Sequence, residues 1–465
     1  MFPQAGALPC EFPFSQNMKL RYILILLTTA LAFFRMQPVF AQQGNLLIHT
    51  GKSGSFGPCN PYIAINPKRP NHMALVLTRI TDNSSGPESA TVRNQVFLSQ
   101  DFGQNWNQKR LRSRYGDFGY PSILADNEGT YYYFHLSDPQ RRGWESKLVL
   151  DRIVCQKSQF LGRWSRGTGI GHNPPRQHDK PGVAFDEYSG RIYLTWTQYD
   201  RYGSANPGDS AHILFSYSND RGKSWTPPIR INQFGGNCLD QGQTPSGAIP
   251  ATGPSGAVYV SWAYDGKIYF DRSLDGGVTW MRRDVVVADQ SGGWSFDIPG
   301  LGRTNGLPST SCDMSYGPFH GNIYVSWTDQ RNGENDTDVW ISRSADGGLN
   351  WSEPLRVNDD QPTMTGAHQF MSRMAVDPIT GIIYIVFYDR RNSENLETEV
   401  YLAISNDGGR TFSNQRISES AFVPDSDHFL GNYIGIAVYG NLVRPVWTRM
   451  DRGVLSVWTA LLDLR

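Results

Sequence analysis

The chain has 465 residues, including 47 glycines and 28 prolines, and its aromatic content is 12%. Few long apolar periodicities accompany this composition, which favours a turn-rich, all-β protein over a helical one. Lys and Arg number 43, as do Asp and Glu, so the formal charge is zero. A neutral chain gives no electrostatic reason to expect a nucleic-acid or anionic-membrane partner.

The amino-terminal stretch has the parts of a secretory signal peptide. A short basic segment, Met18–Arg21, precedes an apolar run, Tyr22–Phe34, and Val39–Ala41 offers small residues at the usual cleavage offsets. We therefore predict cleavage after Ala41 and export to the periplasm or the cell exterior. The alternative is an uncleaved anchor, but the apolar run is well below the roughly 20 residues that a membrane span needs.

Four cysteines follow this leader: Cys59, Cys155, Cys238 and Cys312. Their wide spacing, without a C-x-x-C pair or a His-rich partner, argues against a metal site, and no cofactor is expected. Export would permit disulfides. If one bridge forms, it joins Cys59 to Cys238, because both precede an innermost strand on the same face. Burial as free thiols is an equal alternative.

A short turn motif repeats along the chain. Its pattern is S-x-D-x-G-x-x-W, in which Ser and Asp can accept hydrogen bonds from the turn's own N–H groups and Gly can adopt positive φ. The aromatic residue then folds back under the turn. The matches are Ser99-Asp101-Gly103-Trp106, Ser218-Asp220-Gly222-Trp225, Ser273-Asp275-Gly277-Trp280, Ser344-Asp346-Gly348-Trp351 and Ser405-Asp407-Gly409-Phe412.

The first interval between these turns is about twice the others, which predicts a hidden repeat inside it. Ser158, Gly162 and Trp164 lie midway, in a stretch that lacks the Asp and is one residue shorter. A regular period of roughly 60 residues indicates one repeat array instead of several domains. We therefore predict a leader of residues 1–41 and a single folded domain of residues 42–465.

At these turns the chain resembles the Asp-box, or bacterial neuraminidase repeat, of the sialidase superfamily. The resemblance covers nearly all of the chain after the leader. It implies a β-propeller that acts on a glycan or glycoconjugate, with exo-sialidase-like glycoside hydrolysis as its activity. Because an Asp-box belongs to a turn and also occurs in propellers without sialidase chemistry, the alternative is a non-catalytic glycan- or protein-binding propeller at the cell surface.

The strand pattern predicts seven four-stranded blades. Around one turn, the runs Gln369–Asp377, Ile382–Tyr388 and Glu399–Ser405 read as three strands, and Arg416 belongs to a fourth. First strands of such modules begin near Asn60, Tyr120, Asp179, Pro245, Pro308, Gln369 and Phe429. The last module has only three strands, and Asn45–Thr50 is its expected fourth, which would close the ring. A six-bladed ring with one decorated end is the alternative.

The face opposite the turns carries the long connections, so we expect the site there. These connections are Ser165–His178, Asn232–Thr244 and Ala288–Leu307. Together with the mouth of the central channel they predict a glycan cleft.

An Asp/Arg pattern follows the second strands of three modules, at Asp329–Arg331, Asp389–Arg391 and Arg449–Asp451. A catalytic residue is normally needed once. The recurrence therefore favours a repeated salt-bridged turn over substrate contacts.

Sialidase chemistry, which the resemblance implies, needs an arginine cluster, a tyrosine nucleophile and an aspartic acid/base. The family's first-blade arginine has no counterpart here, because Gly57–Pro61 contains none. We expect Tyr433 as the nucleophile and Asp179 as the acid/base, with weak or undetectable hydrolysis of simple sialosides. The expected substrate-binding residues are His178, Arg303, Arg373, Arg444, His368 and His428.

Overall fold

The computed structural model of this protein describes Met1 and residues 40–52, 57–81, 91–137, 150–362, 367–393 and 395–464. The basic and apolar parts of the predicted signal peptide lie outside the described residues. Within these ranges the regular secondary structure is almost entirely β-strand, and the one helical element is the short 3₁₀ turn Pro254–Gly256. No helix among the described residues is long and apolar enough to cross a membrane.

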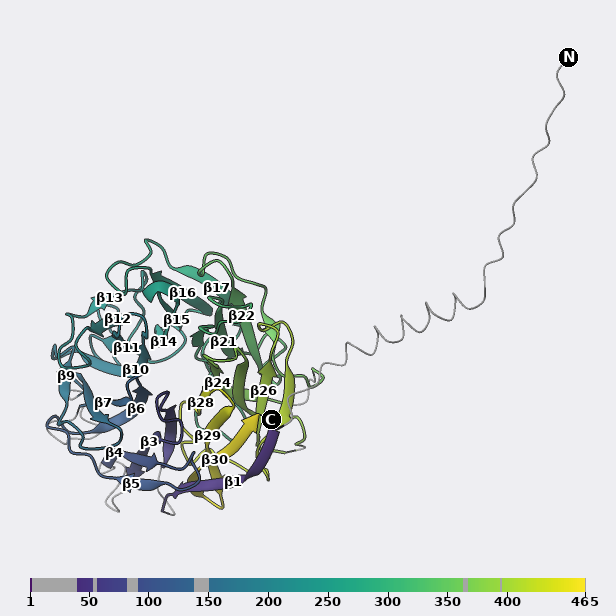
Figure 1. The fold of residues 1–465 in the computed structure, drawn as a ribbon, viewed down its shortest axis with the longest axis horizontal. Coiled ribbons are helices and arrows are strands. Elements are labelled where there is room, and N and C mark those ends of the chain that lie inside the picture. Colours follow the sequence, from purple (N-terminus) through teal and green to yellow (C-terminus); the bar gives the residue numbers. More distant parts are fainter. Residues whose placement is uncertain are drawn as a thin grey trace. The chain divides into compact units, whose positions relative to one another are not determined.

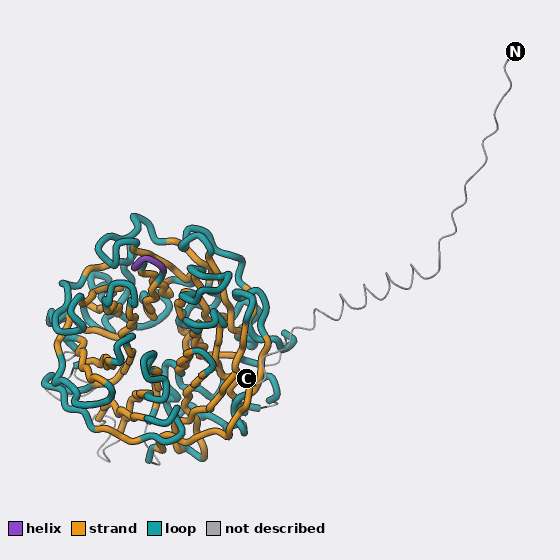
Figure 2. The backbone as a smooth tube through the Cα atoms, viewed as in Figure 1, coloured by secondary structure: helices purple, strands orange, loops and turns teal. Residues whose placement is uncertain are grey.

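Residues Phe40–Leu464 form one compact unit of seven antiparallel four-stranded sheets arranged around a common axis (Figure 1). This is a seven-bladed β-propeller, as the strand pattern predicts, and the six-bladed alternative is wrong. Figure 2 shows the strands of the ring and the loops that join them.

Each of the first three blades uses four consecutive strands, with the innermost strand first. Blade 1 contains β2 (Cys59–Ile65), β3 (Met73–Thr81), β4 (Thr91–Ser99) and β5 (Asn107–Lys109). Blade 2 contains β6 (Phe118–Ala125), β7 (Thr130–Leu136), β8 (Ile153–Gln159) and β9 (Thr168–Ile170). Blade 3 contains β10 (Gln177–Phe185), β11 (Ile192–Tyr199), β12 (Ala211–Ser218) and β13 (Ile229–Arg230).

The next three blades follow the same order, and a small hairpin of β18 (Ser295–Phe296) and β19 (Thr304–Asn305) separates blades 4 and 5. Blade 4 contains β14 (Ser246–Thr252), β15 (Val258–Tyr264), β16 (Lys267–Ser273) and β17 (Val285–Asp289). Blade 5 contains β20 (Ser309–Cys312), β21 (Ile323–Asp329), β22 (Asp338–Ser344) and β23 (Leu355–Arg356). Blade 6 contains β24 (Gln369–Val376), β25 (Ile383–Asp389), β26 (Glu399–Ser405) and β27 (Ser413–Arg416).

Blade 7 joins the two ends of the unit. Its strands are β28 (Gly435–Tyr439), β29 (Leu442–Asp451), β30 (Val454–Leu464) and, from the amino-terminal side, β1 (Phe40–Thr50). β1 runs antiparallel to β30, from the pair Phe40 and Leu464 to the pair Thr50 and Ser456. The predicted closing strand is thus confirmed, although the innermost strand of this blade begins at Gly435 and not near Phe429.

The repeated turns carry the expected hydrogen bonds. Ser344 Oγ donates to Asp346 Oδ1 at 2.8 Å and accepts from the Gly348 N–H at 2.8 Å. Trp351 then packs edge-on against Phe270 of the preceding blade, with ring centroids 5.0 Å apart. The same Ser–Asp and Gly–Ser bonds occur at the turns that begin with Ser99, Ser218, Ser273 and Ser405. Each turn therefore fixes its own loop, and its aromatic plug can bind a blade to its neighbour.

Replacing Gly348 by Ala is expected to destabilise the fold by about 2–4 kcal/mol in urea denaturation. Gly348 has a φ of +88°, and a Cβ there would lie 2.2 Å from a ring carbon of Phe270. Gly440 is the matched control because its φ is +60° and a Cβ would meet nothing within 4 Å. Gly440→Ala should cost only the backbone strain, about 1 kcal/mol. Equal losses for the two variants would contradict the packing argument.

The four described cysteines are free and buried. The expected Cys59–Cys238 bridge is therefore wrong, and the alternative of buried free thiols is correct. The physical reason is the ring: Cys59 begins the innermost strand of blade 1, whereas Cys238 precedes blade 4, three blades away. Burial raises the pKa of the Cys59 thiol to about 12, so this residue stays a protonated core side chain.

Candidate functional site

The innermost strands of several blades are interrupted by a bulge. The pairing of β6 shifts between Phe118 and Ser122, and that of β10 shifts between Asp179 and Gly182. At these bulges the φ angles of Tyr120 and Lys180 are 47° and 51°. The equivalent bulges of β2, β14 and β24 contain Asn60, Gly247 and Met371, all with positive φ. Left-handed backbone at a non-glycine residue costs about 1–3 kcal/mol and is common at functional sites, so these strand entries are candidates for the site.

Four charged side chains meet at the entry of β10. Lys180 Nζ donates to Asp179 Oδ2 at 2.6 Å and to Asp240 Oδ1 at 2.9 Å. Arg303 Nη2 donates to Asp240 Oδ2 at 2.7 Å. Asp240 and Arg303 come from two of the long connections expected to form the site, residues 232–244 and 288–307. We call Asp179, Lys180, Asp240 and Arg303 the channel cluster.

The pKa values of the two carboxyl groups in the channel cluster are shifted by burial and by the neighbouring cations. Asp179, Lys180 and Asp240 are at most 8% exposed, whereas the Arg303 side chain is 33% exposed. Burial raises the pKa of Asp179 above its usual value, although the Lys180 ammonium acts in the opposite direction. Burial alone would also raise the pKa of Asp240, but Lys180 and Arg303 together hold it well below its usual value. The pKa values of the two neighbouring carboxyl groups are thus shifted in opposite directions.

Aromatic side chains surround the channel cluster. The hydroxyl groups of Tyr199 and Tyr202 donate to the two carboxylate oxygens of Asp240 at 3.0 Å and 3.1 Å. The rings of Tyr120 and Trp294 have their centroids 5.7 Å from Lys180 Nζ. Such rings attract the ammonium and keep water away from it.

A small cavity between the innermost strands adjoins the cluster. It has a volume of about 50 Å³, and its lining includes Tyr62, Lys180, Asn305, Arg373 and Tyr433. Arg373 Nη2 donates to the Tyr62 hydroxyl at 2.6 Å, and the Tyr433 hydroxyl donates to the Pro121 carbonyl at 3.1 Å. Burial raises the pKa of Tyr433 well above its usual value, although Arg373 opposes this. Tyr433 is therefore a protonated hydrogen-bond donor at neutral pH.

The three predicted histidines lie outside the channel cluster. His178 Nδ1 accepts from Trp196 Nε1 at 2.6 Å, and burial lowers the pKa of this imidazole to about 4. His368 Nδ1 lies 3.1 Å from Thr337 Oγ1, and burial lowers its pKa to about 4 as well. His428 Nδ1 lies 2.6 Å from Asp425 Oδ1. His178 and His368 are thus neutral, buried side chains with partners of their own.

Arg444 is placed at the opposite end of its blade. Its guanidinium donates to the Phe102 carbonyl at 2.9 Å, in the turn of blade 1, and to Asp463 at 2.9 Å. The structure therefore brings Asp179, Arg303, Arg373 and Tyr433 to the channel but leaves Arg444 in the blade. Besides Arg303 and Arg373, Lys180 is a third cation at the channel.

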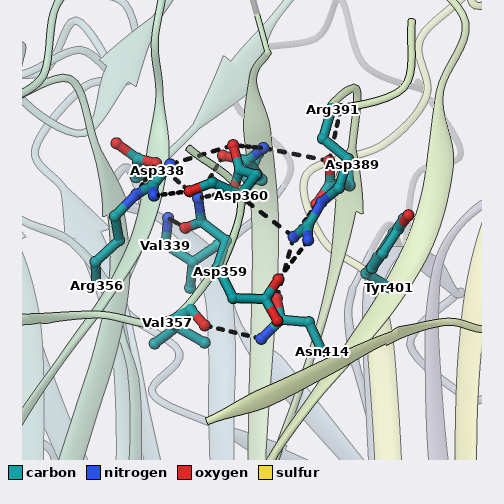
Figure 3. A network of polar contacts seen from close by, with 12 residues as sticks. Asp338, Val339, Arg356, Val357, Asp359, Asp360, Asp389, Arg391, Tyr401 and Asn414 are labelled. Atoms are coloured by element: carbon teal, nitrogen blue, oxygen red, sulfur yellow. Dashed lines mark hydrogen bonds and ion pairs between the residues drawn. The ribbon is translucent and has the colours of Figure 1, made fainter. Parts of the chain in front are cut away.

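The recurring Asp/Arg turns are salt-bridged, as predicted. Their ion pairs are Arg331–Asp329 at 2.5 Å, Arg391–Asp389 at 2.8 Å and Arg449–Asp451 at 2.6 Å. Figure 3 shows the second of these in a wider network in which Arg356 holds Asp338 and Asp360, while Arg391 also reaches Asp359. The network joins blade 5 to blade 6. Because arginines already pair with these carboxylates, few of the carboxylate oxygens are left to bind a substrate.

Sequence reasoning missed Asp240, Tyr120, Tyr199 and Tyr202. These residues are far apart in the chain, and only the ring brings them together. One signal was available, since the dipeptides Asn60-Pro61, Tyr120-Pro121 and Lys180-Pro181 stand at the same position of three innermost strands. A repeated X-Pro in a strand indicates a bulge.

No protein-family model matches this chain, and no curated protein matches it. Among solved structures it is similar to a protein of unknown function from Dyadobacter fermentans DSM 18053, at 14% identity over 92% of this chain and 100% of that chain, with a TM-score of 0.50. It is also similar to a PL25 ulvan lyase bound to GlcA(1-4)Rha3S units, at 12% identity over 89% and 96% of the two chains, with a TM-score of 0.51. The NanB sialidase of Streptococcus pneumoniae matches at 11% identity over 92% and 99%, with a TM-score of 0.49.

At such identities the likeness concerns the fold. The chain has the propeller fold that the resemblance to sialidases implies, and what it does must be argued from its own side chains.

Proposed function

We propose that this protein is a carbohydrate-active enzyme that binds an anionic sugar unit at the channel mouth and cleaves its glycosidic bond. The observation that carries the proposal is the channel cluster, in which the Lys180 ammonium bridges Asp179, whose pKa is raised, and Asp240, whose pKa is lowered. Two carboxyl groups whose surroundings separate their pKa values are suited to act as acid and base. Lys180 and Asp240 are also held at left-handed φ angles of 51° and 55°.

The cations at the channel support a negatively charged substrate. Arg303 and Arg373 are partly exposed, and a partly desolvated guanidinium can hold a carboxylate or sulfate through paired N–H groups. The ulvan lyase with the same fold binds a ligand that contains GlcA, which agrees with this class of substrate. Export through the predicted signal peptide would bring the protein to extracellular or periplasmic glycans.

The residues then have distinct proposed roles. Asp179 donates a proton to the leaving oxygen, and Asp240 stabilises the positive charge that develops on the sugar ring. Arg303 and Arg373 hold the anionic group, and Tyr433 donates a hydrogen bond from the channel wall.

The proposal is tested with the exported protein on aryl glycosides, including uronides and a sialoside, and on uronate-rich and sulfated polysaccharides. Asp179→Asn and Arg373→Ala should each lower turnover by roughly 10²–10⁴ without changing the melting temperature. Asp289→Asn is the matched control, because Asp289 is an exposed aspartate paired with Lys267 on the rim of blade 4. Turnover that survives in Asp179→Asn would contradict the assignment.

The sialoside should be hydrolysed weakly or not at all, because Gly57–Pro61 lacks an arginine and Arg444 does not reach the channel. Reducing ends without ultraviolet absorbance indicate hydrolysis, whereas absorbance from an unsaturated uronate indicates elimination.

A second candidate is the non-catalytic glycan-binding propeller. It is favoured by the burial of Asp179 and Asp240 and by the cavity of about 50 Å³, which is too small for a sugar ring. In that case the channel cluster is a structural link and the ligand lies above it. Glycan binding without turnover on any substrate, unchanged in Asp179→Asn, would select this candidate.

A further inference from the structure

A larger concave site lies on the outer part of the ring, between blades 2 and 3. Its volume is about 570 Å³, within the range of about 300–1,000 Å³ that is typical of ligand sites. Lys157, Arg163, Trp164 and Arg166 line it from blade 2, and Arg221 lines it from the turn of blade 3. We call this site the rim groove. It shares no residue with the channel cluster or the channel cavity.

The rim groove forms where the repeated turn has lost its aspartate. At Trp106, Trp280 and Trp351 the indole N–H donates to the carbonyl of the turn glycine. In blade 2, Phe160 takes the place of the aspartate, with a φ of 47°, and the Gly162 N–H donates to the Gln159 carbonyl instead of a serine hydroxyl.

Two polar groups in the wall of the rim groove lack partners. Ser158 Oγ and Trp164 Nε1 are buried and have no hydrogen bond to any residue that the structure describes, and Ser158 is 2% exposed. The serine lacks the aspartate that pairs with it in the other turns, whereas the indole N–H is also unpartnered at Trp225, in an intact turn. In the intact turns the equivalent serine donates to the aspartate carboxylate. A buried polar group without a partner costs about 1–3 kcal/mol, so an incoming oxygen that pairs with it would be stabilised.

The rim groove is also positively charged. Arg163 and Arg166 are exposed and form no ion pair with any residue that the structure describes. Lys157 Nζ donates to the Arg221 carbonyl at 2.6 Å, and Glu128 pairs with Arg221. In a chain with zero formal charge, this is a local concentration of cations.

The connection before blade 2 adds further cations beside the groove. The Arg114 N–H donates to the Arg166 carbonyl at 3.0 Å, and Gln156 Nε2 donates to both the Arg112 and Ser165 carbonyls. These bonds hold Arg112 and Arg114 close to the lip of the groove. Both residues are exposed.

We propose that the rim groove binds a sulfated or uronate-bearing glycan chain, separately from the channel. Arg163 and Arg166 hold the anionic groups, and an anionic oxygen of the ligand takes the place of the missing turn carboxylate beside Ser158. Trp164 also offers an aromatic surface for a sugar ring. A compact groove with one aromatic wall fits a few sugar units better than a nucleic-acid duplex, which needs cations along an extended face. The inference does not depend on catalysis at the channel.

The test uses the exported full chain and low-mass dextran sulfate as the probe, with unsulfated dextran as the neutral comparison. Titration calorimetry should show binding of dextran sulfate only. The double variant Arg163→Ala/Arg166→Ala should weaken it about tenfold or more, since each charge-assisted contact contributes about 1 kcal/mol or more. The matched control is Arg282→Ala/Arg283→Ala, which removes two exposed arginines from blade 4. This control should change the affinity less than about twofold, since general electrostatic attraction alone is screened by salt.

Several outcomes would overturn the proposal. They are unchanged affinity in Arg163→Ala/Arg166→Ala, an equal loss in the control pair, and equal binding of unsulfated dextran. Duplex DNA of matched charge that bound as tightly would assign the groove to nucleic acid instead. Asp179→Asn should leave dextran sulfate binding intact even where it abolishes turnover, so failure of the channel hypothesis and failure of this one are distinguishable.

Discussion

Deletion of Asn45–Thr50 is expected to remove about 5 kcal/mol or more from the free energy of unfolding and to promote self-association. The segment contains half of the paired positions between β1 and β30, namely Leu46, Leu47, His49 and Thr50, and each ladder hydrogen bond contributes about 1 kcal/mol. Asn45 also ties this strand to blade 6, since Asn45 Nδ2 donates to the Ile417 carbonyl at 2.9 Å and the Glu419 N–H donates to Asn45 Oδ1 at 2.8 Å. The deletion therefore opens the ring at the point where its ends meet and exposes the edge of β30.

Deletion of Ala205–Gly208 is the matched control. This loop between β11 and β12 is exposed, and Ser204 Oγ lies 2.5 Å from Asp209 Oδ2, so its ends are already close. Shortening such a loop changes the closure entropy little. A chain that begins at Gly51 serves as a second variant, because it cannot repair the edge by sliding Phe40–Gly44 into place. Urea denaturation and light scattering measure the effects, and equal stability of the closing-strand and loop deletions would contradict the closure.

The repeated turn made the fold predictable from sequence. Its residues form hydrogen bonds with one another within the turn, as Ser344 does with Asp346 and Gly348. The motif therefore forms the same turn wherever it occurs in the chain. Blade count and closure then follow from spacing. The prediction that the innermost strand of the last blade begins near Phe429 was wrong, because tertiary contacts and not a local motif fix that start. Before β28 the chain makes tertiary bonds, such as the Asn432 N–H to Asn60 Oδ1 at 2.6 Å, which no local pattern reports.

The candidate site was only partly predictable. Asp179 stands at a strand entry, which a repeat places on the channel, but its neighbour Asp240 comes from an irregular connection whose path depends on Arg303 and Lys180. Arg444 shows the converse error. Arg444 lies near the start of β29, at the end of the strand that contacts the turn of blade 1. Its position along the strand therefore keeps it out of the channel, although its guanidinium group suits an anionic substrate. Contacts between blades depend on tertiary packing, which the spacing of the repeated turns does not predict.

Lys180→Met is expected to destabilise the protein by about 3–5 kcal/mol at neutral pH, because it leaves two buried carboxylates without their shared cation. The loss should depend on pH. Burial already raises the pKa of Asp179 in the presence of Lys180, and removal of the ammonium raises it further. A carboxyl group whose pKa is higher in the folded state than in the unfolded chain contributes stability at low pH and loses it as the pH rises through the folded-state value. The gap between wild type and variant should therefore widen from about pH 5 to about pH 8.

Lys267→Met is the matched control for this experiment. Lys267 pairs with Asp289 on the surface, where the two side chains are 43% and 78% exposed. Solvent screens such a pair, so its loss should change stability little and with little dependence on pH. Urea denaturation of both variants and wild type at the two pH values gives the comparison. A loss in Lys180→Met that matched the surface control, or that shrank as the pH rose, would mean that the channel cluster is solvated in the folded protein and that Asp179 is not the proton-favouring member of the pair.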